Sequence, residues 1–171
     1  MADNQTILDF YDVAKRREFA RDFQFRVISL GPLTQEDLVY LRTAELPGKE
    51  IANNKVPYMG LDFNVPGSVI YTGSDSWNVT FLADEAQNIR AKLEAWQEQI
   101  FSIESSSGKY GVPAEEATIT LIDKEFKTIR TYNLIGVYLR VIAPLGYDIK
   151  GSGKPQEFNT TLSYHFWRQL A

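Results

Sequence analysis

The chain has 171 residues, 44% hydrophobic and 23% charged, and this balance predicts one globular domain over residues 1–171 with a real core. The net charge of -4 argues against a surface that grips nucleic-acid phosphates, which needs clustered Lys and Arg. With no Cys and one histidine, His165, the sequence excludes disulfides, thiolate metal sites and histidine clusters. Charges interrupt the first residues, and no long apolar run follows, so we expect cytoplasmic folding without membrane insertion.

The N-terminal segment, residues 1–20, is predicted to contain a short helix over residues 6–19. Thr6 is expected to cap this helix, with Asp9 at the fourth place of a capping box. One side of the helix is apolar: Ile7, Phe10, Tyr11 and Ala14.

Two predicted strands precede a long extended stretch. Alternating apolar residues indicate a strand over residues 23–30, and a second strand is expected from about Leu38 to Leu46. Residues 48–73 are punctuated by Gly, Pro and Asn, which favours an excursion of short strands over a compact hairpin. The excursion carries apolar residues that imply a covering surface on a neighbouring subunit or ring: Ile51, Val56, Tyr58, Met59, Leu61, Phe63 and Val65.

The central stretch, residues 75–101, changes from a strand period to a helix period. Trp77, Val79 and Phe81 alternate with polar residues, as expected of a strand with one buried face. A helix over residues 84–103 should follow, with Asp84 as its N-cap and Gln87 completing a capping box.

The apolar side of this helix is predicted to pack on the sheet through four residues: Ile89, Leu93, Trp96 and Ile100. Arg90 and Glu94 are placed to pair one turn apart on the opposite, solvent-facing side.

The remainder predicts three strands separated by loops. We expect strands over residues 118–123, 127–141 and 157–167, and surface loops over residues 104–116 and 144–155. On the last strand, one face should carry Phe158, Leu162, Tyr164 and Phe166. The predicted fold is therefore mainly β: an antiparallel sandwich or barrel with one prominent α-helix packed on the sheet.

Patterns typical of enzymes are weak in this chain. Residues 146–154 resemble a phosphate-binding loop, but Ser152 stands where that loop needs Lys, and no helix follows. The adjacent acidic residues 84–85 and 115–116 are better read as solvated charges, and His165 as a strand residue. Two glycosylation sequons, at Asn78 and Asn159, are interpreted as accidental. We therefore expect no catalytic site, metal or cofactor.

Small uncharged polar residues share one face of two predicted strands, where a solvent-facing sheet usually carries more charge: Ser76, Asn78, Thr80, Asn159, Thr161 and Ser163. Uncharged polar side chains suit a surface along which another molecule moves without being bound or repelled. The alternative is that these are ordinary β-favouring positions, and the pattern alone leaves both open.

Three motifs, in order, resemble the major tail tube protein of contractile-tailed bacteriophages of the T-even kind. They are Thr43-Ala44-Glu45-Leu46-Pro47-Gly48, the stretch 77–86 leading into the helix, and the ending 158–167. The resemblance runs from about Phe19 to Trp167. One departure is Leu139, where the family's glycine-aromatic-proline turn has Pro.

The resemblance implies a structural virion protein, with six copies in a ring and stacked rings forming the inner tail tube. Its strands would contribute to an oligomeric barrel, whose lumen the polar face would line: Asn78, Thr80, Asn159, Thr161 and Ser163. Implied partners are further copies, the sheath, the baseplate tube-initiating protein, the tail terminator, and the tape-measure protein and DNA inside the lumen. One alternative is the inner tube or tube-initiating protein of a related contractile injection system, a bacteriocin or a secretion apparatus. A second is a monomeric β-barrel that binds a ligand.

Overall fold

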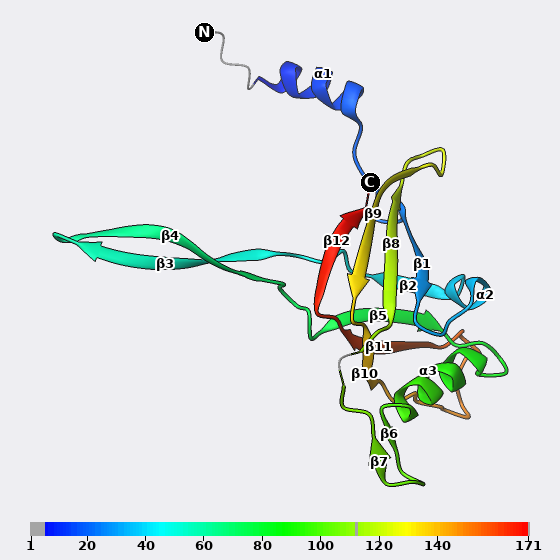
Figure 1. Cartoon of the computed structure of the whole chain (residues 1–171). Coiled ribbons are helices and arrows are strands. Elements are labelled where there is room, and N and C mark those ends of the chain that lie inside the picture. Colours follow the sequence, from blue (N-terminus) through cyan, green and yellow to red (C-terminus); the bar gives the residue numbers. More distant parts are fainter. Residues whose placement is uncertain (1–5, 112, 171) are drawn as a thin grey trace.

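The computed structural model describes residues 6–111 and 113–170, and its body consists of two four-stranded antiparallel sheets. The strands of one sheet cross those of the other at a steep angle, and the core lies between them (Figure 1). The first sheet has the order β1 (Phe25–Leu30), β8 (Glu116–Ile122), β9 (Thr128–Ile135), β12 (Phe166–Leu170). The second has the order β10 (Tyr138–Ile142), β11 (Glu157–Ser163), β5 (Trp77–Leu82), β2 (Leu41–Ala44). The predicted mainly β, antiparallel class is confirmed.

Two predicted strands are each divided between the sheets. The predicted strand 127–141 breaks at Gly136 into β9 and β10, and the predicted strand 157–167 breaks into β11 and β12. The two breaks lie together: the His165 backbone N–H donates to the Ile135 carbonyl at 2.9 Å. Gly136 has a φ of +73°, and a Cβ on it would overlap the His165 ring. A glycine is therefore required at this corner.

The corner also changes which residues face the core on the last strand. Phe158, Leu162 and Tyr164 are buried as expected, but Phe166 is exposed, which corrects its predicted place on the buried face. The chain changes sheets between Tyr164 and Phe166, so the simple alternation does not continue. Trp167 instead packs against the core.

Helix α3 (Asn88–Glu98) lies against β10 and contributes Ile89, Leu93 and Trp96 to the core. It is shorter than the predicted 84–103, so Ile100 lies beyond its end and is half-buried. The Trp96 ring packs on Gly31, where a Cβ would come within 2.7 Å of it.

The N-terminus of α3 differs from the predicted capping box. Gln87 occupies the N-cap position with a left-handed backbone and makes no side-chain cap. Asp84, three residues earlier, still accepts hydrogen bonds from the N–H groups of Asn88 (3.0 Å) and Ile89 (3.4 Å). The predicted pair between Arg90 and Glu94 is confirmed, at 3.0 Å.

The predicted strand 38–46 is shorter in the structure, because Leu38 ends a short helix and residues 39–40 form a turn. Helix α2 (Gln35–Leu38) begins with a capping box between Thr34 and Asp37, and β2 covers only residues 41–44. Lys92 of α3 donates to the Asp37 carboxylate at 2.6 Å and ties the two helices together. Burial raises the pKa of Asp37, but hydrogen bonds from Lys92 and Thr34 outweigh that effect and hold the pKa below its ordinary value.

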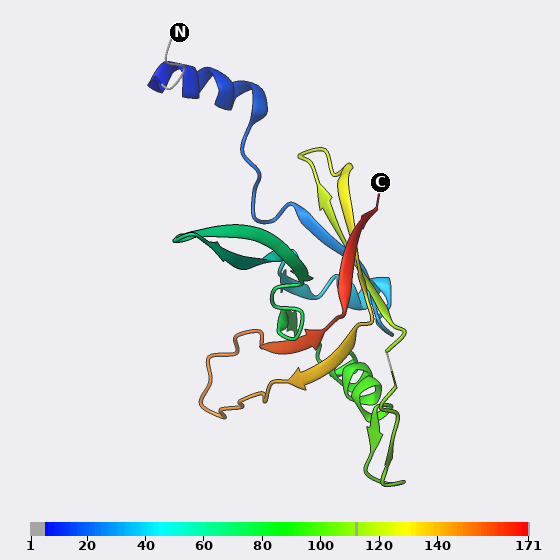
Figure 2. The same ribbon diagram turned by 60° about the vertical axis from the view of Figure 1, so that its left-hand side comes forward.

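Helix α1 (Ile7–Arg17) stands away from the body, and none of its residues is buried (Figure 2). The predicted capping box between Thr6 and Asp9 is confirmed, while residues 1–5 lie outside the described residues. The segment after the helix is held to the β8–β9 turn by an ion pair between Glu18 and Lys124, at 2.9 Å.

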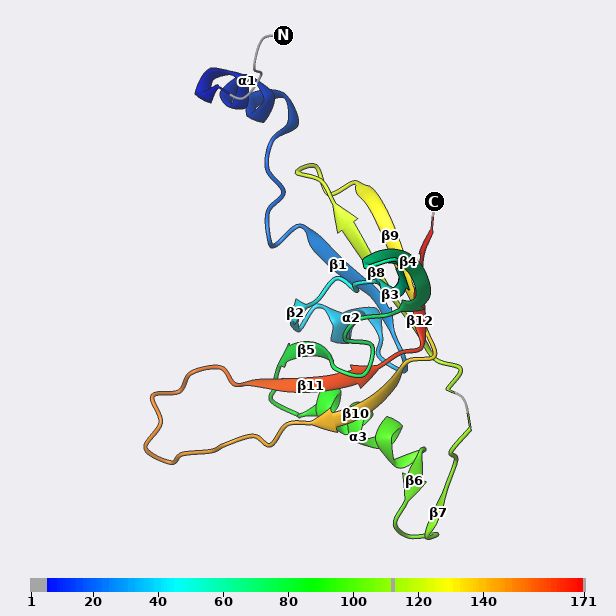
Figure 3. The same ribbon diagram turned by 90° about the vertical axis from the view of Figure 1, so that its left-hand side faces the viewer.

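Two predicted loops take different courses. Residues 143–156 are outside any strand, as predicted, and form a broad loop between β10 and β11 (Figure 3). Within the predicted loop 104–116, β7 (Ser107–Gly108) pairs with β6 (Phe101–Ser102). Strand β8 begins at Glu116, two residues before the predicted strand 118–123.

Replacing Trp96 by Ala should lower the free energy of unfolding by about 3–5 kcal/mol, because a large ring leaves a core that cannot refill the space. Urea denaturation measures this. Glu94→Ala, on the exposed side of the same helix, is the matched control and should change it by less than about 0.5 kcal/mol. A loss below about 1 kcal/mol for Trp96→Ala would mean that α3 does not depend on this packing.

Replacing Gly136 by Ala should destabilise the fold by about 2 kcal/mol or more, since it combines a left-handed backbone with a clash against His165. Adding His165→Ala should restore the part of the lost stability that is due to the clash. The part that is due to the left-handed backbone of residue 136 should remain. A double-mutant cycle measures that coupling. Gly146→Ala, which has open space around it, is the control; equal effects at the two glycines would contradict the role assigned to the corner.

Candidate functional site

A row of uncharged polar side chains lies on the outer face of the second sheet, across its two central strands. Thr161 of β11 donates a hydrogen bond to the Asn78 side-chain oxygen of β5 at 3.1 Å. Thr80 of β5 donates in the same way to Asn159 of β11, at 2.8 Å. Asn78 and Asn159 are exposed, while Thr80 and Thr161 are half-buried. The structure therefore brings together four of the five residues that the sequence assigned to a lumen-facing surface.

The fifth residue, Ser163, does not belong to this exposed surface. It is buried, with 8% of its area exposed, next to the corner where the chain leaves the second sheet. The row extends instead to Thr43 of β2, which pairs with Thr80 and is exposed. The sequence analysis did not predict Thr43 for this face. Strand β2 is only four residues long, and its hydrophobic pattern does not show that it pairs with β5.

The orientation of this face is set by the core on its other side. Trp77, Val79 and Phe81 of β5 point inward, so their alternating neighbours must point outward. Thr160 is the polar exception on the inner side of β11, and it is satisfied because its hydroxyl donates to the Val79 carbonyl at 2.9 Å.

The electrostatics of the face are close to neutral. Its amide and hydroxyl side chains form hydrogen bonds with one another across β5 and β11. Arg42 and Glu157 stand at one end of it, 3.9 Å apart and more than half exposed, so their opposite charges offset each other. Such a surface offers a polyanion little fixed positive charge to bind.

A long arm projects from the body between β2 and β5. Strands β3 (Glu50–Tyr58) and β4 (Leu61–Ile70) pair along their whole length as one hairpin, turning at Met59–Gly60. This corrects the predicted excursion of short strands: Pro57 and Pro66 are accommodated because the hairpin's edges are unpaired. Figures 1 and 2 show the arm extending well beyond the two sheets.

The two faces of the arm differ in chemistry. Asn53, Lys55, Asp62 and Asn64 share one face, where the Asn53 amide donates to Asn64 at 3.2 Å. The opposite face is apolar near the tip, where Val56 pairs with Phe63 and Tyr58 with Leu61.

The apolar residues of the arm are open to solvent in the isolated chain. Exposed fractions range from 44% to 90% for the set expected to contact another subunit: Ile51, Val56, Tyr58, Met59, Leu61, Phe63 and Val65. A two-stranded hairpin is marginally stable in water by itself. An exposed apolar face on a projecting arm is typical of a surface that contacts another molecule.

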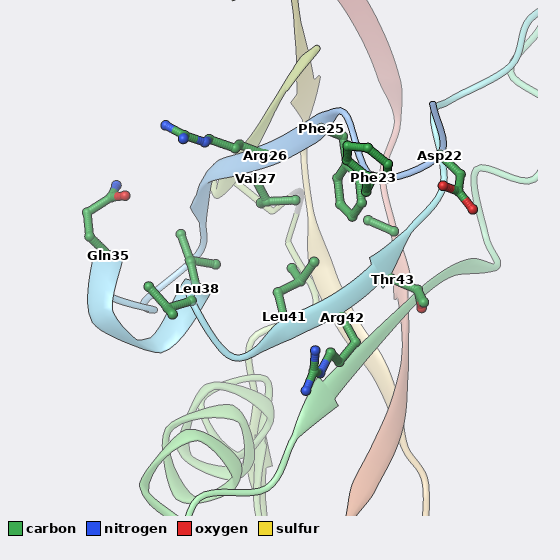
Figure 4. Close-up of a pocket in the computed structure, with 12 residues that line it drawn as sticks. Asp22, Phe23, Phe25, Arg26, Val27, Gln35, Leu38, Leu41, Arg42 and Thr43 are labelled. Carbon is green, nitrogen blue, oxygen red and sulfur yellow. The ribbon is translucent and has the colours of Figure 1, made fainter. Parts of the chain in front are cut away.

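A groove of about 810 Å³ opens between the edges of the two sheets, where β1 and β2 diverge (Figure 4). Phe23, Phe25, Leu38 and Leu41 line it, together with the charged residues Asp22, Arg26 and Arg42. The alternation of Phe23, Phe25 and Val27 signalled an apolar strand face. It could not signal a groove, because that depends on β2 lying opposite.

The described residues hold no group of three or more His, Asp or Glu side chains arranged to bind a metal. His165 lies at the strand corner, beside Gly136. The residues that resembled a phosphate loop fall within the irregular segment 143–156, away from any helix start. Among the helices that the structure describes, none has the length and apolar character needed to cross a membrane.

No model of a known protein family matches the chain. Two curated relatives are the tail tube proteins gp19 of Enterobacteria phages T4 and T6. Each is 27% identical over 157 residues, which cover 88% of this chain and 91% of the relative. The resemblance expected from the sequence motifs is thereby confirmed.

Solved structures with the same fold come from contractile injection systems. One is a chain in the cap of the anti-feeding prophage, with a TM-score of 0.62, 14% identity, and coverage of 89% of this chain and 91% of that one. Another is a chain in the extended sheath–tube complex of the PVC extracellular contractile injection system. Its TM-score is 0.60 at 15% identity, covering 94% of this chain and 97% of that one.

Replacing residues 51–69 by Asn-Gly should leave a folded subunit that no longer self-associates. Glu50 and Ile70 pair across the base of the arm, so a two-residue turn can join them, and the arm adds little to the core. Circular dichroism should show an unchanged fold, and light scattering should show monomers where the parent chain forms larger species. Normal assemblies from this variant would show that the arm is dispensable.

Proposed function

Because the chain is a homologue of phage tail tube proteins, we propose that it is a structural subunit of a contractile tail's inner tube. Six copies form a ring, and stacked rings form a rigid tube through which the genome passes during ejection. The chain carries out no catalysis in this role, and it resides in the virion tail after assembly in the host cytoplasm.

The paired neutral face of the second sheet is the observation that best supports a lumen. The proposed lining consists of Asn78, Thr80, Asn159 and Thr161, joined by hydrogen bonds across β5 and β11. In a closed barrel, alternate residues point inward, so one face of each strand must suit the channel's contents. DNA would slide past amides and hydroxyls that present little positive charge.

The outer strands of the same sheet support ring closure. Strands β10 and β2 are its two ends, and each has a partner on one side only in the described chain. If β2 of one copy pairs with β10 of the next, the sheets join into a continuous barrel and the free edges disappear. The apolar arm then supplies a second contact, to a neighbouring copy or ring.

The proposed partners follow from the place of such a tube within a tail. They are other copies of the chain, the sheath around the tube, the baseplate protein that initiates it, the terminator that ends it, and the tape-measure protein inside it. A monomeric ligand-binding barrel is disfavoured because Trp77, Phe81 and Leu162 fill the space between the sheets, each at most 2% exposed.

Negative-stain electron microscopy of the purified protein tests the proposal directly. Rings with six-fold symmetry or long hollow tubes are expected. A protein that stays monomeric at all accessible concentrations, with and without a tube initiator, would overturn it.

Changing Asn78 and Thr161 to Lys should leave assembly intact but make the tubes retain DNA at low salt. Symmetry repeats the added charge around each ring, and phosphate binding by Lys weakens as salt rises. Release of labelled DNA across a salt gradient measures this. Ser152→Lys with Ile149→Lys, which adds the same charge to the exposed 143–156 loop, is the control. Equal retention by both variants would contradict the lumen assignment.

A further inference from the structure

The direction of the arm is decided at its root, which we define as the segments 45–49 and 71–76 on either side of β3 and β4 (Figure 1). Within the described chain, β3 and β4 form a two-stranded sheet that is separate from both four-stranded sheets. A strand rises about 3.3 Å per residue, so the nine residues of β3 reach roughly 30 Å, and a swing of about 10° at the root moves the tip by about 5 Å. Small movements of the root are therefore large movements of the tip.

Two tryptophan indoles hold the incoming segment of the root, 45–49. The indole N–H of Trp77 donates to the Glu45 carbonyl at 2.8 Å. The indole N–H of Trp167 donates to the Gly48 carbonyl, also at 2.8 Å. The segment lies outside any strand, so the indoles supply the donors that a neighbouring strand would otherwise provide. Because Trp77 belongs to the second sheet and Trp167 to the first, the root is tied to both sheets.

The outgoing segment of the root, 71–76, is held by the same part of the body. The Tyr71 ring packs near the rings of Phe166 and Trp167, with centroids 6.3 Å apart in each pair. The Ser74 carbonyl accepts a hydrogen bond from the Tyr164 backbone N–H at 2.8 Å. These body residues belong to the crossing from β11 to β12, so the corner that joins the two sheets also holds the arm.

Trp167 joins the two segments of the root to the body. Its ring makes edge-on contacts with Tyr71 of the root and with Tyr132 of β9, at centroid distances of 6.3 and 5.4 Å. The Lys49 ammonium lies 5.9 Å from the centre of the same ring. The side chain is half-buried, so a phenyl ring could take part of its place, but it could not donate to the Gly48 carbonyl. The hydrogen bond is therefore the part of this contact that requires Trp.

We propose that Trp77 and Trp167 are positioning residues for the arm, and that their indole N–H groups hold it at one angle to the body. The use of that angle in assembly rests on the proposed tube. An arm that is already held at its bound angle loses little freedom when it meets another molecule, whereas a mobile arm has to be ordered at that moment. The two indoles thereby lower the concentration at which subunits assemble.

Distances between two spin labels test whether the indoles hold the arm, and the chain has no Cys of its own to interfere with labelling. Lys55→Cys on the arm and Thr128→Cys on β9, both exposed, report the angle of the arm at concentrations below assembly. Trp167→Phe should widen the distance distribution about two-fold or more, because one of the two indole hydrogen bonds is lost. Trp96→Phe, the same change on α3, should leave the width of the parent chain. An unchanged width for Trp167→Phe would overturn the inference.

Assembly of the same two variants tests what the fixed angle does. Trp167→Phe should raise the concentration at which tubes form about five-fold or more, because each subunit then has to order its arm on assembly. Trp96 is the more deeply buried ring, so Trp96→Phe should lower the melting temperature at least as much, yet change that concentration less than about two-fold. No increase for Trp167→Phe, or equal increases for both variants, would overturn the inference. If the parent chain forms no tubes, the proposed function fails, while the distance distributions still decide whether the indoles hold the arm.

Discussion

The architecture depends on one close backbone approach, where Gly136 meets His165. Two continuous stretches of chain change sheets at this point, one from β9 to β10 and the other from β11 to β12. The backbone hydrogen bond from His165 to Ile135 holds the two crossings together. Each of these two stretches contributes one strand to each sheet. Neither sheet can therefore slide against the other without breaking the corner. The steep crossing of the sheets, and hence the single core between them, follow from it.

The exposed faces are consequences of that core. Once Trp77, Val79 and Phe81 are committed to the interior, the residues between them have to face outward, and a slip of one residue would bury Asn78 and Thr80. Their cross-strand partners on β11 are fixed by the same register. The neutral row is thus held in place by the packing of its inward-facing neighbours, so the core does not restrict which side chains stand in the row.

Hydrophobic periodicity and capping motifs in the sequence were sufficient to predict those elements of the fold that depend on neighbouring residues alone. The strand at Trp77, the helix side with Leu93 and Trp96, and the capping box at Thr6 each carry their own signal within a few residues. The three motifs also pointed to the tail tube proteins to which the chain is similar.

The errors arose where tertiary contacts decide the structure. Nothing local in residues 127–141 shows that Gly136 must turn because a ring from a distant strand lies against it. Ser163 continues the polar alternation in sequence, yet it is buried because the chain leaves the sheet just beyond it. The prolines at 57 and 66 suggested breaks, but in a two-stranded arm each strand has a free edge on which the missing N–H costs no ladder bond. The groove joins two segments, around Phe25 and Leu41, that only the folded chain brings together.

In the proposed tube, the two kinds of contact would do different work. Pairing between β2 and β10 of adjacent copies uses backbone groups, which every residue has, so it supplies affinity but selects register only weakly. The side chains of the apolar arm would select register more strongly, because a shift of one residue along the edge would move the arm off the surface that covers it. The arm is well suited to this second task, since it extends well beyond the two sheets whose register it would set (Figure 1). An arm whose apolar residues are open to solvent in the isolated chain would then be a reasonable feature of a chain whose stable state is the assembly.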